Sequence, residues 1–232
     1  MADKRTLLIS CEMPHKIEEI LGFLGYGCVR LPSCAALDTP VASHPDMLFY
    51  KLPSGELLCD SQYFEENAPL LLKTGARFTA SAMRLGKKYP HDVLFDAFAV
   101  DGTLYARLDA VAPEIADSYE RAVNVKQGYA KCSTLLAGEL AVTADKGIYK
   151  ALTENGVKTL LISPETVRLT GYGCGFIGGA SFFDEKSRTV VLFGEPKTDD
   201  PVPSFLEENG IRVMYPYGFP LTDFGGAIAV DR

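Results

Sequence analysis

The sequence has 232 residues, with 23 basic and 30 acidic side chains and a formal net charge of −7. Its 47% hydrophobic and 23% charged residues are ordinary for a globular protein and exclude disordered, collagenous and coiled-coil classes. We expect a single domain over residues 1–232 that buries a large core. An acidic chain without a basic run suits neither nucleic acid nor an anionic membrane, so neither is an expected partner. The sequence leaves the oligomeric state open.

The cysteines and histidines indicate no disulfide framework and no metal site. No C-x-x-C motif is present, and no pair of histidines has the spacing of zinc ligands. Near the N-terminus, the apolar run at residues 7–9 is too short for a signal peptide. We therefore expect reduced cysteines, a cytoplasmic location and no cofactor. The six cysteines are at positions 11, 28, 34, 59, 132 and 174.

Short helices that end at a glycine and lead into a strand recur along the chain. Glycine after a helix adopts the left-handed conformation at little cost, so the chain can turn back. Ser61 is expected to cap the second of these helices, Pro113 to begin the third and Asp145 to precede the fourth. The expected helices cover residues 14–24, 61–73, 114–122, 146–155 and 203–209.

Hairpins alternate with these helices. Their starting points, at residues 46, 92, 132, 176 and 223, are separated by 46, 40, 44 and 47 residues. This spacing predicts an α/β fold of five strand–strand–helix–strand repeats. The last strand, residues 222–230, has no partner after it, so we expect it to pair with residues 5–10. The expected hairpin strands are 47–52 with 56–59, 93–100 with 103–108, 132–137 with 140–143, and 176–183 with 189–193.

Five such units resemble the pentein propeller, the fold of guanidino-group-modifying enzymes such as arginine and agmatine deiminases, dimethylarginine hydrolases and amidinotransferases. The phrases at residues 43–47, 128–132, 171–179 and 220–226 are more closely similar to a bacterial branch of that superfamily. The resemblance implies a five-bladed propeller of ββαβ repeats with pseudo-fivefold symmetry, closed by the N- and C-terminal strands. It also implies a central channel lined by the hairpins, with the ligand site at one end.

The superfamily's chemistry uses a cysteine nucleophile, a histidine acid–base and carboxylates that pair with the planar guanidinium. Many members carry Gly-Gly-x-His-Cys in the last unit, where this chain has Ile228 and Ala229 at the histidine and cysteine positions. Members also carry a Gly-His-x-Asp phrase in the fourth unit, where this chain has Gly-Phe-Ile-Gly at residues 175–178. We therefore expect no deiminase or hydrolase turnover by the usual route.

Acidic residues open three of the expected hairpins. By resemblance, Asp46, Asp92 and Asp223 would bring carboxylates to one end of the channel, although each also suits a solvated turn. Lys131 and Cys132 open the third hairpin, where an ammonium group would favour a thiolate.

Residues 173–178 match G-x-G-x-x-G, but a hairpin rather than a helix follows them. The glycines therefore predict close packing of backbone in the channel rather than a nucleotide site.

Three functions fit this sequence. The first is binding of a small polar ligand, guanidinium- or amino-acid-like, by Asp46, Asp92, Lys131 and Asp223. The second is a divergent hydrolase or amidinotransferase that uses Cys132 with His44 or an acidic base. The third is a non-catalytic scaffold for protein interaction. Carboxylates and a thiol that converge on the channel would favour chemistry, whereas a channel closed by apolar residues would favour the scaffold.

Overall fold

The computed structural model describes residues 5–230 and contains five three-stranded sheets. The ends of the expected domain, residues 1–4 and 231–232, lie outside the described residues. In four of the sheets, two consecutive strands form an antiparallel hairpin, a helix follows, and the third strand pairs parallel with the second. The first two of these units are β3 (Phe49–Lys51), β4 (Leu57–Asp60), α3 (Ser61–Leu71) and β5 (Phe78–Ser81), and then β6 (Phe98–Val100), β7 (Thr103–Ala106), α4 (Pro113–Ala116) and β8 (Arg121–Asn124). The next unit is β9 (Thr134–Ala137), β10 (Leu140–Thr143), α5 (Lys146–Glu154) and β11 (Lys158–Leu161). The last is β12 (Ser181–Asp184), β13 (Thr189–Leu192), α6 (Pro201–Glu208) and β14 (Arg212–Met214).

The fifth sheet joins the two ends of the described chain. It contains β15 (Ala227–Val230), β1 (Arg5–Ser10) and β2 (Tyr26–Leu31), and α1 (His15–Phe23) connects β1 to β2. β1 is the central strand, antiparallel to β15 from Thr6 opposite Val230 and parallel to β2. The expected pairing of the terminal strands is confirmed for residues 6–9 and 227–230, but residues 222–226 of the expected last strand lie outside the ladder.

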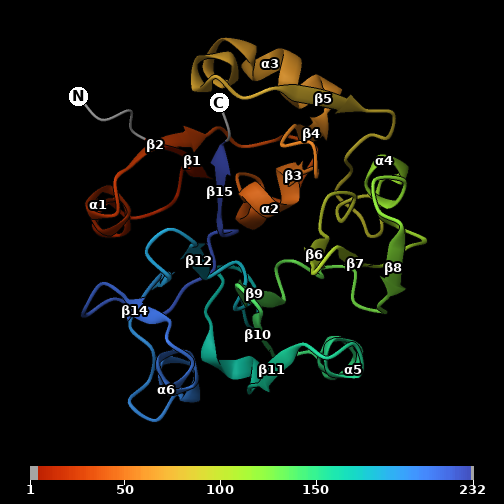
Figure 1. Ribbon diagram of the computed structural model, residues 1–232. Coiled ribbons are helices and arrows are strands. Elements are labelled where there is room, and N and C mark those ends of the chain that lie inside the picture. Colours follow the sequence, from red (N-terminus) through yellow and green to blue (C-terminus); the bar gives the residue numbers. More distant parts are fainter. Residues whose placement is uncertain (1–4, 231–232) are drawn as a thin grey trace.

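Figure 1 shows β3, β6, β9, β12 and β15 toward the middle of the molecule, while the helices that follow the hairpins and the helix α1 lie outside. Each helix buries an apolar stripe against its sheet, such as Ile17 and Leu21 of α1 or Ile148 and Leu152 of α5. Apolar residues three to four positions apart share one helical face, so even helices of nine residues can cover a sheet. In residues 5–230, no helix has the length and apolar character needed to span a bilayer.

The helix signals read from the sequence are confirmed with two corrections. Asp60, not Ser61, caps α3, because its Oδ1 accepts the backbone N–H groups of Gln62 and Tyr63. The helix expected over 114–122 is wrong beyond its first turn, since β8 already pairs with β7 from Arg121. The glycines after the helices adopt the expected left-handed conformation at positions 25, 75, 156 and 210.

The first strand of every hairpin begins later than the sequence pattern predicts. Residues 45–48 form the short helix α2 (Pro45–Leu48) before β3, and turns precede β6, β9 and β12. Before β9 and β12 the early residues bond to buried carboxylates instead of the ladder, as Cys132 N–H does to Asp96 and Phe176 N–H to Asp223, whereas before β3 and β6 they form local backbone turns. The positions expected to open the strands are therefore turns at the middle of the molecule.

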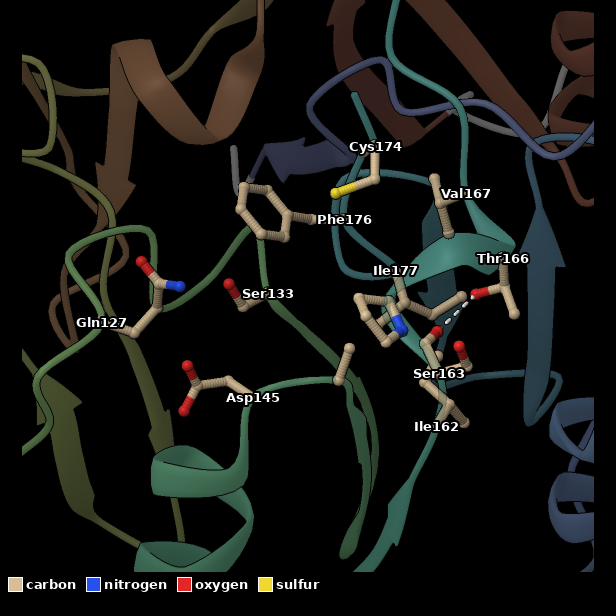
Figure 2. Close-up of a pocket in the computed structure, with 13 residues that line it drawn as sticks. Gln127, Ser133, Asp145, Ile162, Ser163, Thr166, Val167, Cys174, Phe176 and Ile177 are labelled. Atoms are coloured by element: carbon tan, nitrogen blue, oxygen red, sulfur yellow. Dashed lines mark hydrogen bonds between the residues drawn. The ribbon is translucent and has the colours of Figure 1, made fainter. Parts of the chain in front are cut away.

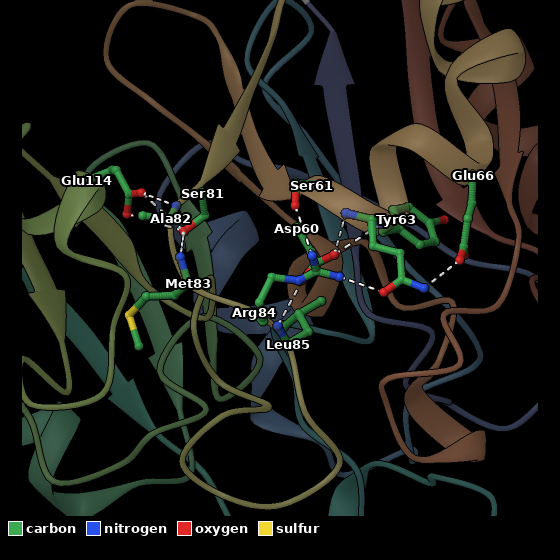
Figure 3. Close-up of polar contacts among 11 residues, drawn as sticks. Asp60, Ser61, Tyr63, Glu66, Ser81, Ala82, Met83, Arg84, Leu85 and Glu114 are labelled. Carbon is green, nitrogen blue, oxygen red and sulfur yellow. Dashed lines mark hydrogen bonds and ion pairs between the residues drawn. The ribbon is translucent and has the colours of Figure 1, made fainter.

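The long connection from β5 to β6 is anchored by two carboxylates, shown in Figure 3. Asp60 Oδ2 accepts the backbone N–H of Leu85 and the Arg84 guanidinium, both at 3.0 Å. Glu114, in the first turn of α4, accepts the backbone N–H of Ala82 at 2.6 Å and the Ser81 hydroxyl. These contacts fix the connection at its start, and its later part carries Asp92 and Asp96.

The pairing of β1 with β15 predicts a large stability loss when β1 is weakened. Leu8 is fully buried, whereas the control residue Leu72 is 60% exposed. Leu8→Ala should lower the free energy of unfolding by about 2–5 kcal/mol because it leaves a cavity. Leu72→Ala should change it by less than about 0.5 kcal/mol. Urea unfolding measures both, and equal effects of the two substitutions would contradict the buried central strand.

Candidate ligand-binding site

Turns from four of the five units bring buried polar side chains together at the middle of the molecule. Asp46 comes from α2, Asp96 from the turn before β6, Cys132 from the turn before β9 and Asp223 from the turn before β15. None of the four side chains is more than 4% exposed. We call these four residues the central cluster.

Asp96 fixes the turn that carries Cys132. Its Oδ1 accepts the backbone N–H groups of Lys131 at 2.6 Å and Cys132 at 3.1 Å. Its Oδ2 accepts a hydrogen bond from the Cys132 thiol, with 2.7 Å between Oδ2 and Sγ. The sequence interpretation singled out Asp92 in this unit and missed Asp96. A charged residue inside the apolar run at 93–98 was the available signal, since unpaired acids are rarely buried.

Asp223 is held in the same manner. Its Oδ2 accepts the backbone N–H of Phe176 and its Oδ1 that of Gly225, both at 2.9 Å. His44 Nδ1 lies 3.6 Å from Oδ1 of the same carboxyl group. A Cβ on Gly179 would collide with this carboxyl group and one on Gly225 with His44, so glycine is required at both positions. The expectation that the glycines of residues 173–178 permit close packing is confirmed for Gly175 and Gly178, where a Cβ would collide with backbone atoms, and is wrong for Gly173, where a Cβ would meet nothing within 4 Å.

Asp46 differs from its neighbours because neither carboxyl oxygen has a hydrogen-bond partner, although both are buried. Its backbone N–H donates to Gly225 O at 3.2 Å, which places the side chain beside the last unit. An unpaired buried carboxylate loses the hydration that stabilises its charge. Within residues 5–230, Asp46 is therefore the member of the central cluster whose carboxyl oxygens have no hydrogen-bond partner, although the nearby Lys131 charge opposes the rise of its pKa.

Burial shifts the protonation of the whole cluster. Burial raises the pKa of Asp46. It also raises the pKa of Asp96 well above the usual range, and the nearby charge of Asp46 raises it further. It raises the pKa of Asp223 to about 6, although backbone N–H groups and the nearby Lys131 charge oppose the shift. Burial lowers the pKa of His44, so its imidazole is neutral at neutral pH.

Cys132 is held as a thiol. Burial raises its pKa well above the usual range, and the charges of Asp46, Asp96 and Asp223 act in the same direction. The sequence-based expectation that Lys131 would favour a thiolate is therefore wrong. Lys131 Nζ lies 3.5 Å from Gly178 O, and three carboxyl groups outweigh its single charge.

The central cluster lies between two cavities. The larger, of about 490 Å³, is lined by His44, Asp92, Cys132 and Asp223 among others. The smaller, of about 270 Å³, is lined by Asp46 and Lys131 together with residues of β3, β6, β9 and β15. The structure thus brings all six candidate residues to the middle of the fold but divides them between two openings. We call the larger one the central cavity.

A third hollow, of about 170 Å³, lies beside the central cavity and shares Cys174 and Phe176 with it. In Figure 2, Gln127, Ser133 and Asp145 lie on one side of it and Ile162, Ser163 and Val167 on the other. Phe176 is therefore a wall between two spaces, and Cys174 is an exposed residue at their shared edge.

Ile228 and Ala229, which stand at the positions of the superfamily's usual histidine and cysteine, are not part of the central cluster. Ile228 lines the smaller of the two cavities, and Ala229 pairs with Leu7 inside a sheet. Within residues 5–230, no group of three or more His, Cys, Asp or Glu side chains is placed to hold a metal ion. The arrangement is suited to a cation whose charge is spread over several atoms, because Asp223 reaches the central cavity and Asp46 the smaller one from different units.

The state of Cys132 predicts its reactivity. Because the thiolate is the reactive form, iodoacetamide at neutral pH should modify the exposed Cys174 and leave Cys132 unmodified in the folded protein. Both should react in urea, which serves as the control. Peptide mass spectrometry measures the two sites separately. Alkylation of Cys132 at the rate of Cys174 would contradict the protonated, buried thiol.

Comparison with solved structures shows the fold that this chain shares. An amidinotransferase of saxitoxin biosynthesis from Microseira wollei superposes with a TM-score of 0.54 at 11% identity, over 94% of this chain and 80% of that one. A dimethylarginine dimethylaminohydrolase, solved as an adduct with 4-chloro-2-hydroxymethylpyridine, gives 0.55 at 10% identity over 92% of both chains. A cyanobacterial arginine dihydrolase of the ornithine–ammonia cycle gives 0.61 at 13% identity, but this chain spans only 40% of it. The chain therefore has the mixed α/β fold of the pentein enzymes.

No curated protein matches the sequence. A family model covers residues 8–228, which is nearly all of the described chain. Its matched span includes the central cluster and all five sheets except the ends of β1 and β15. The chain belongs to the family DUF6873, described as a family of unknown function.

Proposed function

We propose that this protein binds a small cationic ligand, guanidinium- or amine-like, over the central cluster. The observation that carries the proposal is Asp46, whose two buried carboxyl oxygens have no partner. A cation supplies the missing hydrogen bonds and adds positive charge to that of Lys131, which alone does not offset the burial of this carboxyl group. The ligand would enter by the central cavity, where His44, Cys132 and Asp223 reach the space, and its charge would act across the central cluster on Asp46, which lines the smaller cavity.

The charges of the site support a cation rather than an anion. Three carboxyl groups, those of Asp46, Asp96 and Asp223, face one ammonium group, that of Lys131, and His44 is neutral. Without a ligand, mutual repulsion and burial keep protons on some of these carboxyl groups. A bound cation removes the repulsion and allows them to ionise.

The fold supports a guanidinium-like group in particular. The structural neighbours are described as acting on arginine, on dimethylarginine or in amidino transfer. We propose for this chain the corresponding five-bladed propeller with pseudo-fivefold symmetry, its channel running through the central cluster. The six free cysteines are in keeping with a cytoplasmic setting, which we also propose.

A second candidate function is hydrolysis or amidino transfer that depends on Cys132. It is favoured by the 2.7 Å contact between Cys132 Sγ and Asp96 Oδ2, which gives the thiol a proton acceptor other than His44. A cationic ligand beside this pair would stabilise the thiolate. Turnover of a guanidino compound that Cys132→Ala abolishes would distinguish this candidate from binding alone.

Substitution of Asp46 separates binding from stability. Asp46→Asn keeps the shape but removes the charge, so it should weaken binding of agmatine or arginine by about tenfold or more. It should leave the melting temperature unchanged or higher, because the carboxyl group has no partner to lose.

Glu207→Gln, which changes an exposed carboxylate, is the matched control. Calorimetry measures the affinities and thermal unfolding the stability. Equal affinity of both variants and the wild type for every cation tested would contradict the role of Asp46.

The pKa of Asp223 sets the pH dependence of binding. Burial raises this pKa to about 6, so the carboxyl group is charged above that pH and protonated below it. A cationic ligand prefers the charged form, so affinity should fall by up to about tenfold per pH unit below that point. Protonation of His44 would repel the ligand and act in the same direction.

Calorimetric titrations from pH values below to values above the Asp223 pKa test this dependence. Binding below that pH should release protons, because the ligand ionises a carboxyl group that is protonated in the free protein, and titration in two buffers of different ionisation enthalpy detects this. Affinity that is constant across the range would show that the carboxyl groups of the cluster do not hold the ligand.

A further inference from the structure

The outer wall of the central cavity contains a second carboxyl group that lacks a partner. Asp92 is only 8% exposed and lines this cavity. Its Oδ2 accepts the hydroxyl of Tyr129 at 2.6 Å, whereas its buried Oδ1 has no hydrogen-bond partner. Burial and the bond to Asp92 raise the pKa of Tyr129, so its hydroxyl remains a donor. Asp92 is thus a buried acid with one oxygen unpaired.

Three aromatic rings lie around Asp92 and line the same cavity. Tyr129 stacks on Phe176, with ring centroids 5.9 Å apart and planes 27° apart. Tyr89 lies 6.4 Å from Tyr129 and rests on Gly128, where a Cβ would come within 2.5 Å of the ring. We call Asp92, Tyr89, Tyr129 and Phe176 the outer subsite.

The chemistry of the outer subsite suits an alkylated ammonium group. Aromatic faces attract a cation within about 6 Å of the ring centroid, and methylated ammonium groups gain most because they are weakly hydrated. Tyr89 already holds one cation on its ring, since the Arg107 guanidinium carbon lies 5.1 Å from the centroid. The unpaired oxygen of Asp92 supplies the opposite charge that three rings alone would lack.

The charged residues that line the outer part of the central cavity also favour a cationic group there. Asp38 also lines the cavity and accepts the hydroxyl of Tyr172 at 2.8 Å. Lys87 is the basic residue of the described lining, and it is exposed to solvent. The Arg107 guanidinium on Tyr89 is paired with Asp109 at 2.8 Å and adds no net charge. The carboxyl groups of Asp38 and Asp92 thus stand against one solvated ammonium group in the outer part of the cavity, a balance that favours a second positive charge on the ligand.

We propose that the outer subsite binds an ammonium group, and that the ligand of this protein is a dication with one charge at the outer subsite and the other at the central cluster. The part that concerns the inner charge rests on the proposed function. The outer subsite stands on its own residues. A linear diamine or a guanidinoalkylamine has the required chemistry, whereas a ligand with a single cationic group would leave Asp92 unpaired.

Tetramethylammonium tests the outer subsite alone, because it offers no N–H group to the central cluster. Calorimetry should detect its binding to the wild type, and Asp92→Asn should weaken it by about tenfold. Tyr129→Phe keeps the ring and should retain binding, whereas Tyr129→Leu should lose it. Tyr89→Leu, at a residue 43% exposed, provides a second ring deletion if Tyr129→Leu does not fold. Glu207→Gln should bind as the wild type does.

Butylamine and 1,4-diaminobutane test the dication. The diamine should bind the wild type more tightly, and Asp92→Asn should remove that advantage while leaving butylamine unchanged. Asp46→Asn should weaken both amines. If butylamine binds and 1,4-diaminobutane binds no more tightly, the proposal of an outer subsite is wrong and the proposed function stands. If tetramethylammonium binds through Asp92 and neither amine responds to Asp46→Asn, the proposed function is wrong and the outer subsite stands. Absence of binding by all three probes would overturn both.

Discussion

A carboxyl group removed from water needs donors or an opposite charge, and this requirement organises the middle of the molecule. Asp96 and Asp223 meet it with backbone N–H groups, two for each residue. Those bonds hold the turns before β9, β12 and β15 in place, which explains why these three strands begin late. Asp46 does not meet the requirement within the described chain, and this makes it the most informative residue of the site.

The fold separates the parts that stabilise it from the parts available to a ligand. Apolar stripes of the outer helices and the buried central strand β1 supply the hydrophobic contacts. The turns that precede the inner strands carry polar side chains, and glycines such as Gly179 and Gly225 let backbone and carboxyl groups approach closely. Substitutions in the first set change stability, whereas an isosteric change such as Asp46→Asn removes charge without removing packing. A site built on turns between sheets can vary in this way while the sheets stay the same.

The similarity to pentein enzymes concerns the fold, and the local chemistry of this chain differs. By resemblance, the usual nucleophile and histidine would lie in the last unit, where this chain has Ala229 and Ile228. The one thiol in the central cluster comes instead from the third unit and is paired with a carboxyl group. A thiol among carboxylates is poorly activated, whereas the same carboxylates are well suited to a cation. The arrangement therefore supports recognition of a cationic ligand more directly than it supports covalent chemistry.

Local signals in the sequence determined much of the architecture. Glycines after short apolar-striped helices, hairpin turns and an even spacing predicted the strand–strand–helix–strand order, because each depends on residues close together in the chain. The lone terminal strands predicted the pairing of β1 with β15. Tertiary structure decided which acids meet: Asp96 joined the central cluster, and Asp92 lies on the cavity wall beside Tyr129. It also decided that Cys132 is a thiol, since its protonation depends on carboxyl groups from three other turns. Burial and charge interactions act through space between residues far apart in sequence, so no local pattern could have fixed them.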